Sequence, residues 1–391
     1  MFSGVISLEL SDDQRALQEL ARTFAAREIR PIAAGVDEAD DGRVPWELWE
    51  KATEVGLTTY MLPGEYGGGG VHDCLSECLI QEELSHGDGG LGSLVTSGGF
   101  FAGPVLALGS PEQQRRYLTR LCEGPRPPLT SLATTEPDFG SDAAGMTTRA
   151  RRSEGGYVLS GQKTWVSNGG VAELYVVFAQ TEPGSRSKGV TAFVLERGAA
   201  GLRFGPPMKK LGDRGIVNTE LFLDDAFVSD EQRLGEEGSG FTGLMQTFDR
   251  SRVVLAAGCV GMARAAYEYA VAYARERVQF GRPIIEHQAV GFRLADVAMR
   301  IDAARLLTWQ AALRIDAGER ATREAAMAKL YASEAAMFSA WAAVQTLGGF
   351  GYSREYPVEK WFRDAKLEEI WEGTSDIQRL IISRDLARVG P

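Results

Sequence analysis

The sequence predicts an α+β protein of 391 residues in three parts. These are an N-terminal all-α domain over residues 1–124, a central β-barrel-like domain over 125–240 and a C-terminal antiparallel four-helix bundle over 241–391. Three observations predict this order. Apolar residues recur at helical spacing up to about residue 120. Short β-rich runs separated by Gly and Pro follow, and long alanine-rich helical stretches joined by short loops fill the remainder.

Caps and prolines mark the helices of the first part. Ser11 followed three residues later by Gln14 is a capping box, so a helix is expected to begin there. Pro31 is expected to close that helix, because proline lacks the N–H that a helix interior needs. Pro45 is expected to open the next helix and Pro111 the last one of this part, since the first helical turn tolerates proline.

The middle and last parts differ in their apolar pattern. The β-rich runs are 157–159, 174–179, 190–195 and 220–223. They are short and bounded by turn residues, as in a small β-domain. The long helical stretches are 253–277, 289–317 and 323–347. Short loops between long helices favour antiparallel neighbours.

Composition argues against several classes of function. The net charge of −11 and pI near 5.1 do not suit a nucleic-acid binder. No apolar run approaches the roughly 18 residues of a membrane span, and residues 1–10 lack the pattern of a secretory signal. The four cysteines are expected to be reduced, packed thiols of a cytoplasmic protein. With three histidines in the chain, no metal site is expected.

Residues 369–379, which read EIWEGTSDIQR, hold the first candidate for chemistry. They place Glu372 directly after Trp371, and a carboxylate against an aromatic wall loses water. The pKa of such a carboxyl rises, which makes it a usable general base. Thr374 or Ser375 can cap the helix that follows, and the amides of its first turn suit a negative or electron-rich ligand.

Four further segments carry candidate binding residues. Residues 134–142 read TTEPDFGSD, a loop whose amides can donate to an anionic or carbonyl group. Residues 161–169 read GQKTWVSNG. Residues 275–282 read RERVQFGR, where Arg277 offers a forked donor suited to phosphate. Residues 345–352 read QTLGGFGY, where glycines permit close approach of a nucleotide. No strand–GxGxxG–helix unit supports a Rossmann site.

In their order and spacing these five segments resemble the acyl-CoA dehydrogenase family over nearly the whole chain. The resemblance implies FAD as the cofactor and Glu372 as the base that removes the α proton of an acyl thioester while the β hydride passes to the flavin. It implies that the flavin is held by residues drawn from all five segments. These are Thr135, Ser141, Trp165, Ser167, Arg277, Gln279, Phe280, Gln345, Gly348, Gly349, Thr374 and Asp376. The implied substrate-binding residues are Ser141, Phe248, Arg252, Trp371 and Gly373.

The resemblance also limits the alternatives. Some family members carry the base on the helix near Phe248, but the corresponding residue here is Ser251, which cannot act as a base at neutral pH. Expected partners are an acyl-CoA substrate, an electron-transfer flavoprotein as electron acceptor and further copies of the chain in a homotetramer. An acyl-carrier-protein thioester as substrate stays open, as do a non-desaturating flavin oxidase or monooxygenase and a catalytically silent subunit. Phe100, Phe101 and Trp371 suggest a short, branched or ring-bearing acyl group.

Overall fold

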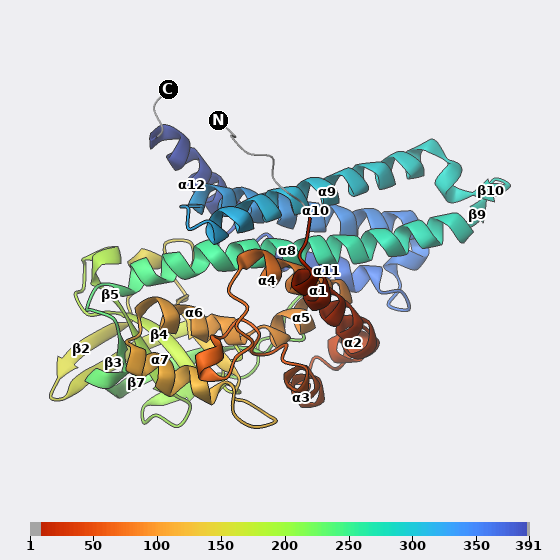
Figure 1. The fold of residues 1–391 in the computed structure, drawn as a ribbon. Coiled ribbons are helices and arrows are strands. Elements are labelled where there is room, and N and C mark those ends of the chain that lie inside the picture. Colours follow the sequence, from red (N-terminus) through yellow and green to blue (C-terminus); the bar gives the residue numbers. More distant parts are fainter. Residues whose placement is uncertain (1–8, 389–391) are drawn as a thin grey trace.

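The computed structural model describes residues 9–388, and helices, strands and again helices follow one another along that range (Figure 1). This order confirms the predicted α+β class. The domain boundaries at 124 and 240 stay predictions. The N-terminal helices are α1 (Asp12–Phe24), α2 (Arg30–Ala39), α3 (Trp46–Glu54), α4 (Cys74–Gly87), α5 (Gly89–Val95), α6 (Gly98–Leu108) and α7 (Pro111–Arg120).

Helix caps decide where the N-terminal helices begin. Ser11 and Gln14 form the predicted capping box at the start of α1. Pro45 is the N-cap of α3 and Pro111 is the first residue of α7, so both prolines open helices as expected. The prediction that Pro31 ends the first helix is wrong. The chain passes from α1 through a π-helical turn, Ala25–Ile29, straight into α2, where Pro31 occupies the first turn. There its missing N–H has little to lose, because the wider turn has already interrupted the α-helical ladder.

The middle part is a sheet of eight strands in the order β6-β7-β3-β2-β4-β5-β8, with β1 added parallel to β4. The longest ladder joins β3 and β7. Every residue of β4 is buried, because alternate side chains enter two different cores. The strands are β1 (Thr130–Ala133), β2 (Arg149–Ser153), β3 (Gly156–Ser167), β4 (Leu174–Gln180), β5 (Val190–Glu196), β6 (Leu202–Phe204), β7 (Asn218–Ser229) and β8 (Arg233–Leu234).

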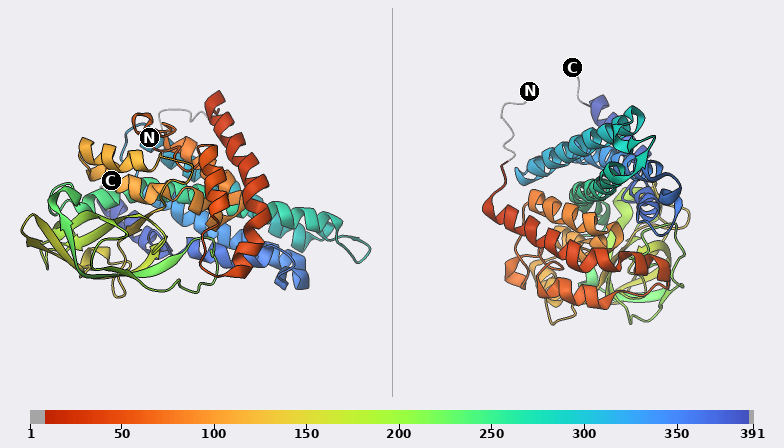
Figure 2. Two further views of the ribbon diagram at one scale, coloured as in Figure 1. Left: turned by 90° about the horizontal axis from the view of Figure 1, so that it is seen from below. Right: turned by 90° about the vertical axis from the view of Figure 1, so that its right-hand side faces the viewer.

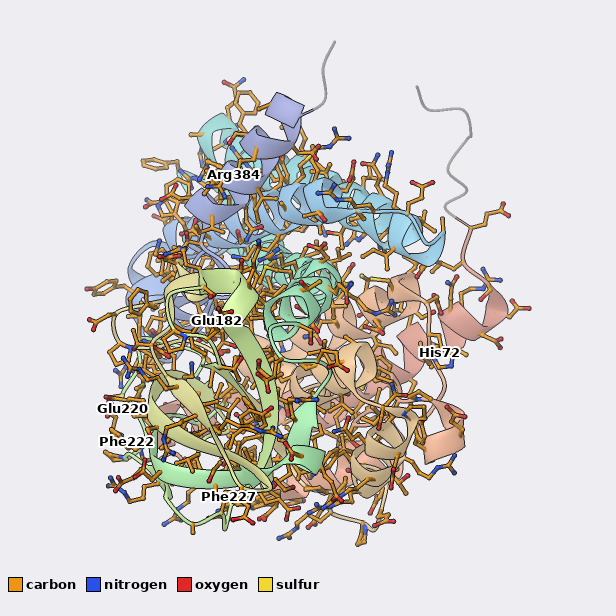
Figure 3. The ribbon with its side chains drawn as sticks, turned by 90° about the vertical axis from the view of Figure 1, so that its left-hand side faces the viewer. His72, Glu182, Glu220, Phe222, Phe227 and Arg384 are labelled. Carbon is orange, nitrogen blue, oxygen red and sulfur yellow. The ribbon has the colours of Figure 1, made fainter. Side chains whose placement is uncertain are left out.

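Long helices form the last part. Figure 1 shows α8, α9 and α10 running side by side along the molecule, with the strands at one end and the β9–β10 hairpin at the other. The strands gather on one side of these helices (Figure 2), and Figure 3 views that end with its side chains. The elements are α8 (Gly240–Glu276), β9 (Val278–Gln279), β10 (Arg282–Pro283), α9 (Gln288–Asp316), α10 (Thr322–Leu347), α11 (Val358–Glu368) and α12 (Ser375–Arg388).

Residues 9–388 bear on two predictions made from composition, the absence of a membrane-spanning helix and the reduced state of the cysteines. No single helix in this range has the length and apolar character to cross a membrane. Helices α5 and α6 together pass that test, but they bend by 45° at their junction. All four cysteines are free, and Cys74, Cys78 and Cys259 are buried, as expected for packed thiols. The expectation that residues 1–10 are not a secretory signal rests mostly on residues 1–8, which lie outside the described residues.

Candidate active site

Glu372 lies in a tight turn between α11 and α12. Its φ is +51°, and that of Gly373 is +96°, so the chain passes twice through the left-handed region that residues other than glycine rarely adopt. Three side chains from other elements hold the turn. Arg252 Nε donates to the Glu372 carbonyl at 3.0 Å, and both Gln378 Nε2 (2.8 Å) and Lys329 Nζ (3.0 Å) donate to the Gly373 carbonyl. Such support is what a strained functional residue requires.

The Glu372 carboxylate meets the first requirement for a general base. Burial raises its pKa, while the hydrogen bond from Ser251 and the charges of Arg252 and Lys329 oppose that rise without cancelling it. Ser251 Oγ donates to Glu372 Oε2 at 2.7 Å. The residue that sequence analysis set aside as no base is therefore a direct partner of the base. It orients the carboxylate, and the second oxygen accepts no hydrogen bond from residues 9–388.

Four of the five predicted substrate-binding residues surround Glu372. Gly373 follows it, and Trp371 precedes it with the indole Nε1 donating to Glu368 Oε2 at 2.9 Å. The Arg252 guanidinium lies 5.4 Å from the centre of the Phe248 ring. The fifth residue, Ser141, is exposed on the loop that precedes β2 and has no hydrogen bond to this group among residues 9–388.

A second group of predicted residues lies on the β-domain. Trp165 is 57 % exposed, and its φ is +56°. The β3–β7 register shifts between Lys163 and Val166, and such a bulge re-aims a side chain out of a strand. Ser167 Oγ accepts from Asn218 Nδ2 at 3.2 Å, and the Thr135 carbonyl accepts from Thr164 N at 2.9 Å. Thr135, Trp165 and Ser167 thus belong to one surface, with a large aromatic face left uncovered.

A buried ion pair supports this surface and was missed from the sequence. Lys163 Nζ donates to Glu136 Oε1 at 2.8 Å and to the Thr134 carbonyl at 3.0 Å, and both charged side chains are buried. Burial raises the pKa of Glu136, but Lys163 and the hydrogen bonds from Thr147 and Thr148 outweigh it and lower the pKa to about 2. The available signal was a lysine in the 161–169 segment, two residues before Trp165, since a buried lysine requires a partner.

The third group lies in a groove of about 480 Å³ that is lined by Tyr273, Arg277, Gln279, Ile284, Thr346, Leu347, Gly348, Gly349 and Phe350. Arg277 forms no ion pair with residues 9–388, and its guanidinium lies 5.7 Å from the centre of the Phe350 ring. An uncompensated guanidinium beside glycines in an open groove suits a phosphate-bearing ligand. Four predicted cofactor residues are thus brought together here.

The remaining predicted cofactor residues are not part of that groove. Phe280 is 94 % exposed at the tip of the β9–β10 hairpin, and Gln345 is exposed on α10. Thr374 Oγ1 accepts from Ile377 N at 3.3 Å and caps α12, as predicted, while Asp376 is exposed in the first turn. The β9–β10 hairpin, which contributes Gln279 to the groove, and strand β3, which carries Trp165 and Ser167, lie toward opposite ends of the molecule (Figure 1). The sequence did not predict this separation within one chain.

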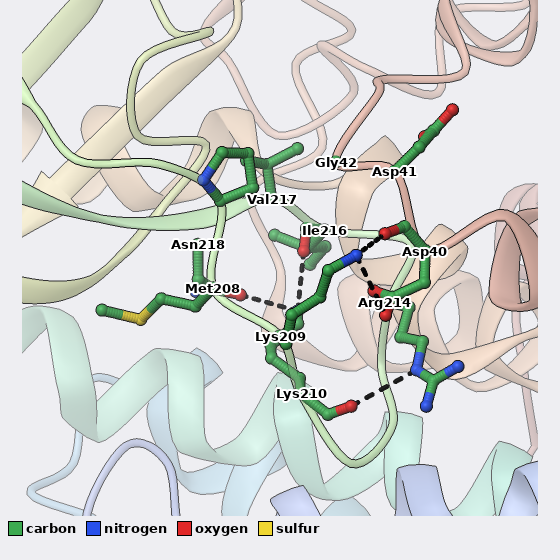
Figure 4. Close-up of a pocket in the computed structure, with 11 residues that line it drawn as sticks. Asp40, Asp41, Gly42, Met208, Lys209, Lys210, Arg214, Ile216, Val217 and Asn218 are labelled. Atoms are coloured by element: carbon green, nitrogen blue, oxygen red, sulfur yellow. Dashed lines mark hydrogen bonds and ion pairs between the residues drawn. The ribbon is translucent and has the colours of Figure 1, made fainter.

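A smaller hollow of about 130 Å³ lies between the α2–α3 connection and the segment that leads into β7 (Figure 4). The Lys209 ammonium is paired there with Asp40, at 3.3 Å from its Oδ2. Lys210 Nζ donates to the carbonyls of Asp213 and Ile216 and to Asn218 Oδ1, each at 2.7 Å. Both ammonium groups have protein partners, so neither is left unpaired to bind an anionic ligand in this hollow. Lys210 and Asn218 connect it to Ser167.

Comparison with known proteins identifies one family over nearly the whole chain. Family models described as the N-terminal, middle and C-terminal domains of acyl-CoA dehydrogenase match residues 11–125, 131–226 and 238–387. An acyl-CoA dehydrogenase of Bacillus subtilis is 41% identical over 382 residues, covering 97% of this chain and 99% of the relative. The mitochondrial short-chain specific acyl-CoA dehydrogenase of Bos taurus is 39% identical over 383 residues, covering 98% and 92%. Butyryl-CoA dehydrogenase of Megasphaera elsdenii superposes with a TM-score of 0.93 at 37% identity, covering 98% and 100%.

The chain belongs to the acyl-CoA dehydrogenase family. Its three domains and its relatives over nearly the full length assign it acyl-CoA dehydrogenase activity, as a flavoprotein oxidoreductase of acyl-CoA metabolism.

Proposed function

We propose that the protein binds FAD and desaturates a short acyl-CoA between its α and β carbons, with Glu372 as the base. The observation that carries this proposal is the Glu372 carboxylate itself. It is partly buried, its pKa is raised, and one oxygen is bound by Ser251. A carboxyl with a raised pKa is a stronger base when ionised, and the α proton of a thioester is a weak acid.

The backbone of the same turn supplies a second function. The N–H of Glu372 donates to no atom of residues 9–388, although the neighbouring N–H of Trp371 donates to the Leu367 carbonyl. A free N–H next to the base can donate to the thioester carbonyl oxygen. Negative charge develops on that oxygen as the α proton leaves, and a fixed donor stabilises it. Base and donor then belong to one residue.

The residues fit FAD in two places. The exposed face of Trp165, with Thr135 and Ser167 beside it, suits a flat aromatic ring system. The unpaired Arg277 guanidinium suits the pyrophosphate. When bound, FAD would supply the acceptor for the β hydride. The residues proposed to hold it are Thr135, Ser141, Trp165, Ser167, Arg277, Gln279, Phe280, Gln345, Gly348, Gly349, Thr374 and Asp376.

The separation of these two places within one chain supports a site shared between chains, and we propose a homotetramer built from two dimers. An apolar stripe offers a surface for association. Phe292, Met299 and Leu306 follow one another at seven-residue spacing on α9, and each is more than half exposed. Seven-residue spacing places all three on one face of the helix. Trp341 on α10 is also exposed beside this helix.

Replacing Arg277 by Ala is expected to weaken FAD retention and loosen the dimer together. The guanidinium of one chain would bind the pyrophosphate of FAD whose ring lies on the partner, so one substitution removes both links. Sedimentation of apo and holo forms, with flavin content measured in parallel, checks this. The control is Arg275→Ala, which removes an arginine two residues away in the last turn of α8. A stable monomer that holds FAD tightly would contradict the shared site.

The proposal also covers the acyl group of the substrate, the electron acceptor and the cellular location. A short straight acyl-CoA is supported by the short-chain specific and butyryl-CoA relatives. Electrons must leave the flavin after each turnover, and we propose an electron-transfer flavoprotein as the acceptor. A cytoplasmic location is supported by the four free cysteines, since thiols persist in reducing compartments.

A panel of acyl thioesters, assayed with an artificial electron acceptor, tests the substrate. The value of kcat/KM is expected to be highest near four carbons and to fall by at least about tenfold at twelve, since each methylene that cannot be accommodated costs on the order of 1–3 kcal/mol. The same acyl groups on an acyl-carrier protein serve as the comparison. Preference for the carrier-protein thioesters, or for long chains, would overturn this assignment.

A further inference from the structure

A buried polar cluster lies beneath the catalytic turn and takes no part in the chemistry described above. It consists of Lys329 on α10, Glu368 at the end of α11 and Cys259 on α8, all buried. Lys329 donates to the Gly373 carbonyl at 3.0 Å. Glu368 Oε2 accepts from Trp371 Nε1 at 2.9 Å and from Cys259 Sγ at 3.4 Å. The cluster therefore binds the residues on both sides of Glu372.

Lys329 is 0 % exposed, yet its ammonium forms no ion pair within 4 Å among residues 9–388 and donates to a backbone carbonyl. Burying an ammonium in this way is costly, and it usually needs a carboxylate at contact distance. Here the ammonium binds a backbone carbonyl. The charged or titratable groups that face it are Cys259, Glu368 and Glu372, with Arg252 opposing them, and burial lowers its pKa. Its positive charge also opposes the rise in the pKa of Glu372.

Glu368 is suited to hold Trp371 without disturbing the base. Burial, and next the charge of Asp213, raise the pKa of Glu368 to about 8. The carboxyl is therefore mostly protonated at neutral pH. It can accept from the indole without adding a second negative charge beside Glu372, which would compete with ionisation of the base.

We propose that Lys329 and Glu368 are positioning residues of this active site: Lys329 fixes the Gly373 carbonyl and with it the Glu372 side chain and N–H, and Glu368 fixes the Trp371 indole as a wall of the acyl pocket. This rests on the proposed function of Glu372. Neither residue touches the reacting atoms. Loss of Lys329 therefore lowers kcat by misplacing the base, whereas loss of Glu368 releases the indole and changes acyl binding.

The Lys329→Met holoenzyme tests the first half with butyryl-CoA. We expect kcat to fall by at least about tenfold, since a misplacement near 1 Å can cost about a hundredfold, while KM changes by less than about threefold. The ascending limb of the kcat–pH profile moves to higher pH, because a positive charge that lowers the pKa of Glu372 is gone. Lys366→Met, which removes an exposed lysine of α11 paired with Glu369, is the matched control.

Amide hydrogen exchange over residues 369–378 gives a readout that does not depend on turnover. Lys329→Met is expected to speed exchange there in both apo and holo forms, and Lys366→Met is not. Unchanged exchange together with an unchanged pH profile would overturn the role of Lys329. If Lys329→Met does not fold, Lys329→Gln, which keeps one donor, is measured in the same way.

Glu368→Leu and Glu368→Gln test the second half. Glu368→Leu is expected to raise the KM for butyryl-CoA several-fold and to reduce the preference for short over long acyl groups. Glu368→Gln keeps an acceptor oxygen for the indole and is expected to rescue most of that loss. Equal defects in both variants, or none in either, would contradict the role. Wild-type turnover on acyl-CoA, measured in the same series, separates failure of this proposal from failure of the proposed function.

Discussion

Replacing Glu372 by Gln is expected to lower the rate of acyl-CoA-dependent flavin bleaching by about a hundredfold or more, the usual cost of removing a general base. The amide keeps the shape of the side chain and can still meet Ser251, but it cannot accept the α proton. The FAD content and unfolding temperature should stay close to those of the wild type. Anaerobic stopped-flow reduction with butyryl-CoA measures the effect.

Glu369→Gln is the control for this experiment. Glu369 lies three residues away at the end of α11 and pairs with Lys366 at 2.6 Å instead of facing Ser251. This variant removes the same charge from the same segment and should keep its rate. If Glu372→Gln retained more than about a tenth of the wild-type rate, another group would have to act as the base.

The second large effect is on stability. Lys163→Met is expected to cost ~3–5 kcal/mol of unfolding free energy, because it leaves the buried Glu136 carboxylate without its ammonium partner. Removing one partner is destabilising because the other charge stays buried without compensation. The intact pair itself adds little net stability, because burying both charges costs nearly as much as their attraction returns. Burial lowers the pKa of Lys163 to about 8, while the pKa of Glu136 falls to about 2, so the two partners contribute with opposite signs.

Urea unfolding at neutral pH, with Lys188→Met as an exposed lysine control, measures this cost. The dependence on pH provides an internal check. The depressed pKa of Glu136 gives stability that is present above its unfolded value near 4.5 and is lost as pH falls toward 2. Lys163→Met should weaken that dependence. A destabilisation equal to that of Lys188→Met would show that the pair does not support the β-domain.

The sequence predicted what local pattern determines. The capping box at Ser11, the order of helices and strands, and Glu372 beside Trp371 all rest on neighbours within a few residues. Pro31 was misjudged because a π-helical turn, which has no clear sequence signal, shifts the helix register just before it. Phe248, Arg252, Trp371 and Gly373 lie around Glu372, and their binding of substrate stays a prediction.

Contacts between residues far apart in the chain could not be predicted from the sequence. Lys163 meets Glu136 across 27 residues, Lys329 meets Gly373 across 44, and Ser251 meets Glu372 across 121. Such pairs depend on the packing of whole elements. The separation of Arg277 from Trp165 likewise needs the length and direction of α8, which no motif contains. The roles of the individual cofactor residues stay predictions.

We expect this chain to hold one FAD, with Glu372 taking the α proton of a short acyl-CoA while FAD accepts the β hydride. Anaerobic titration of the purified, fully reconstituted protein with butyryl-CoA tests it most directly. We expect a yellow protein with one FAD per chain that bleaches on addition of the thioester, together with formation of the α,β-unsaturated product. A colourless protein that takes up no FAD, or a yellow one that short acyl-CoA thioesters leave oxidised, would contradict the account.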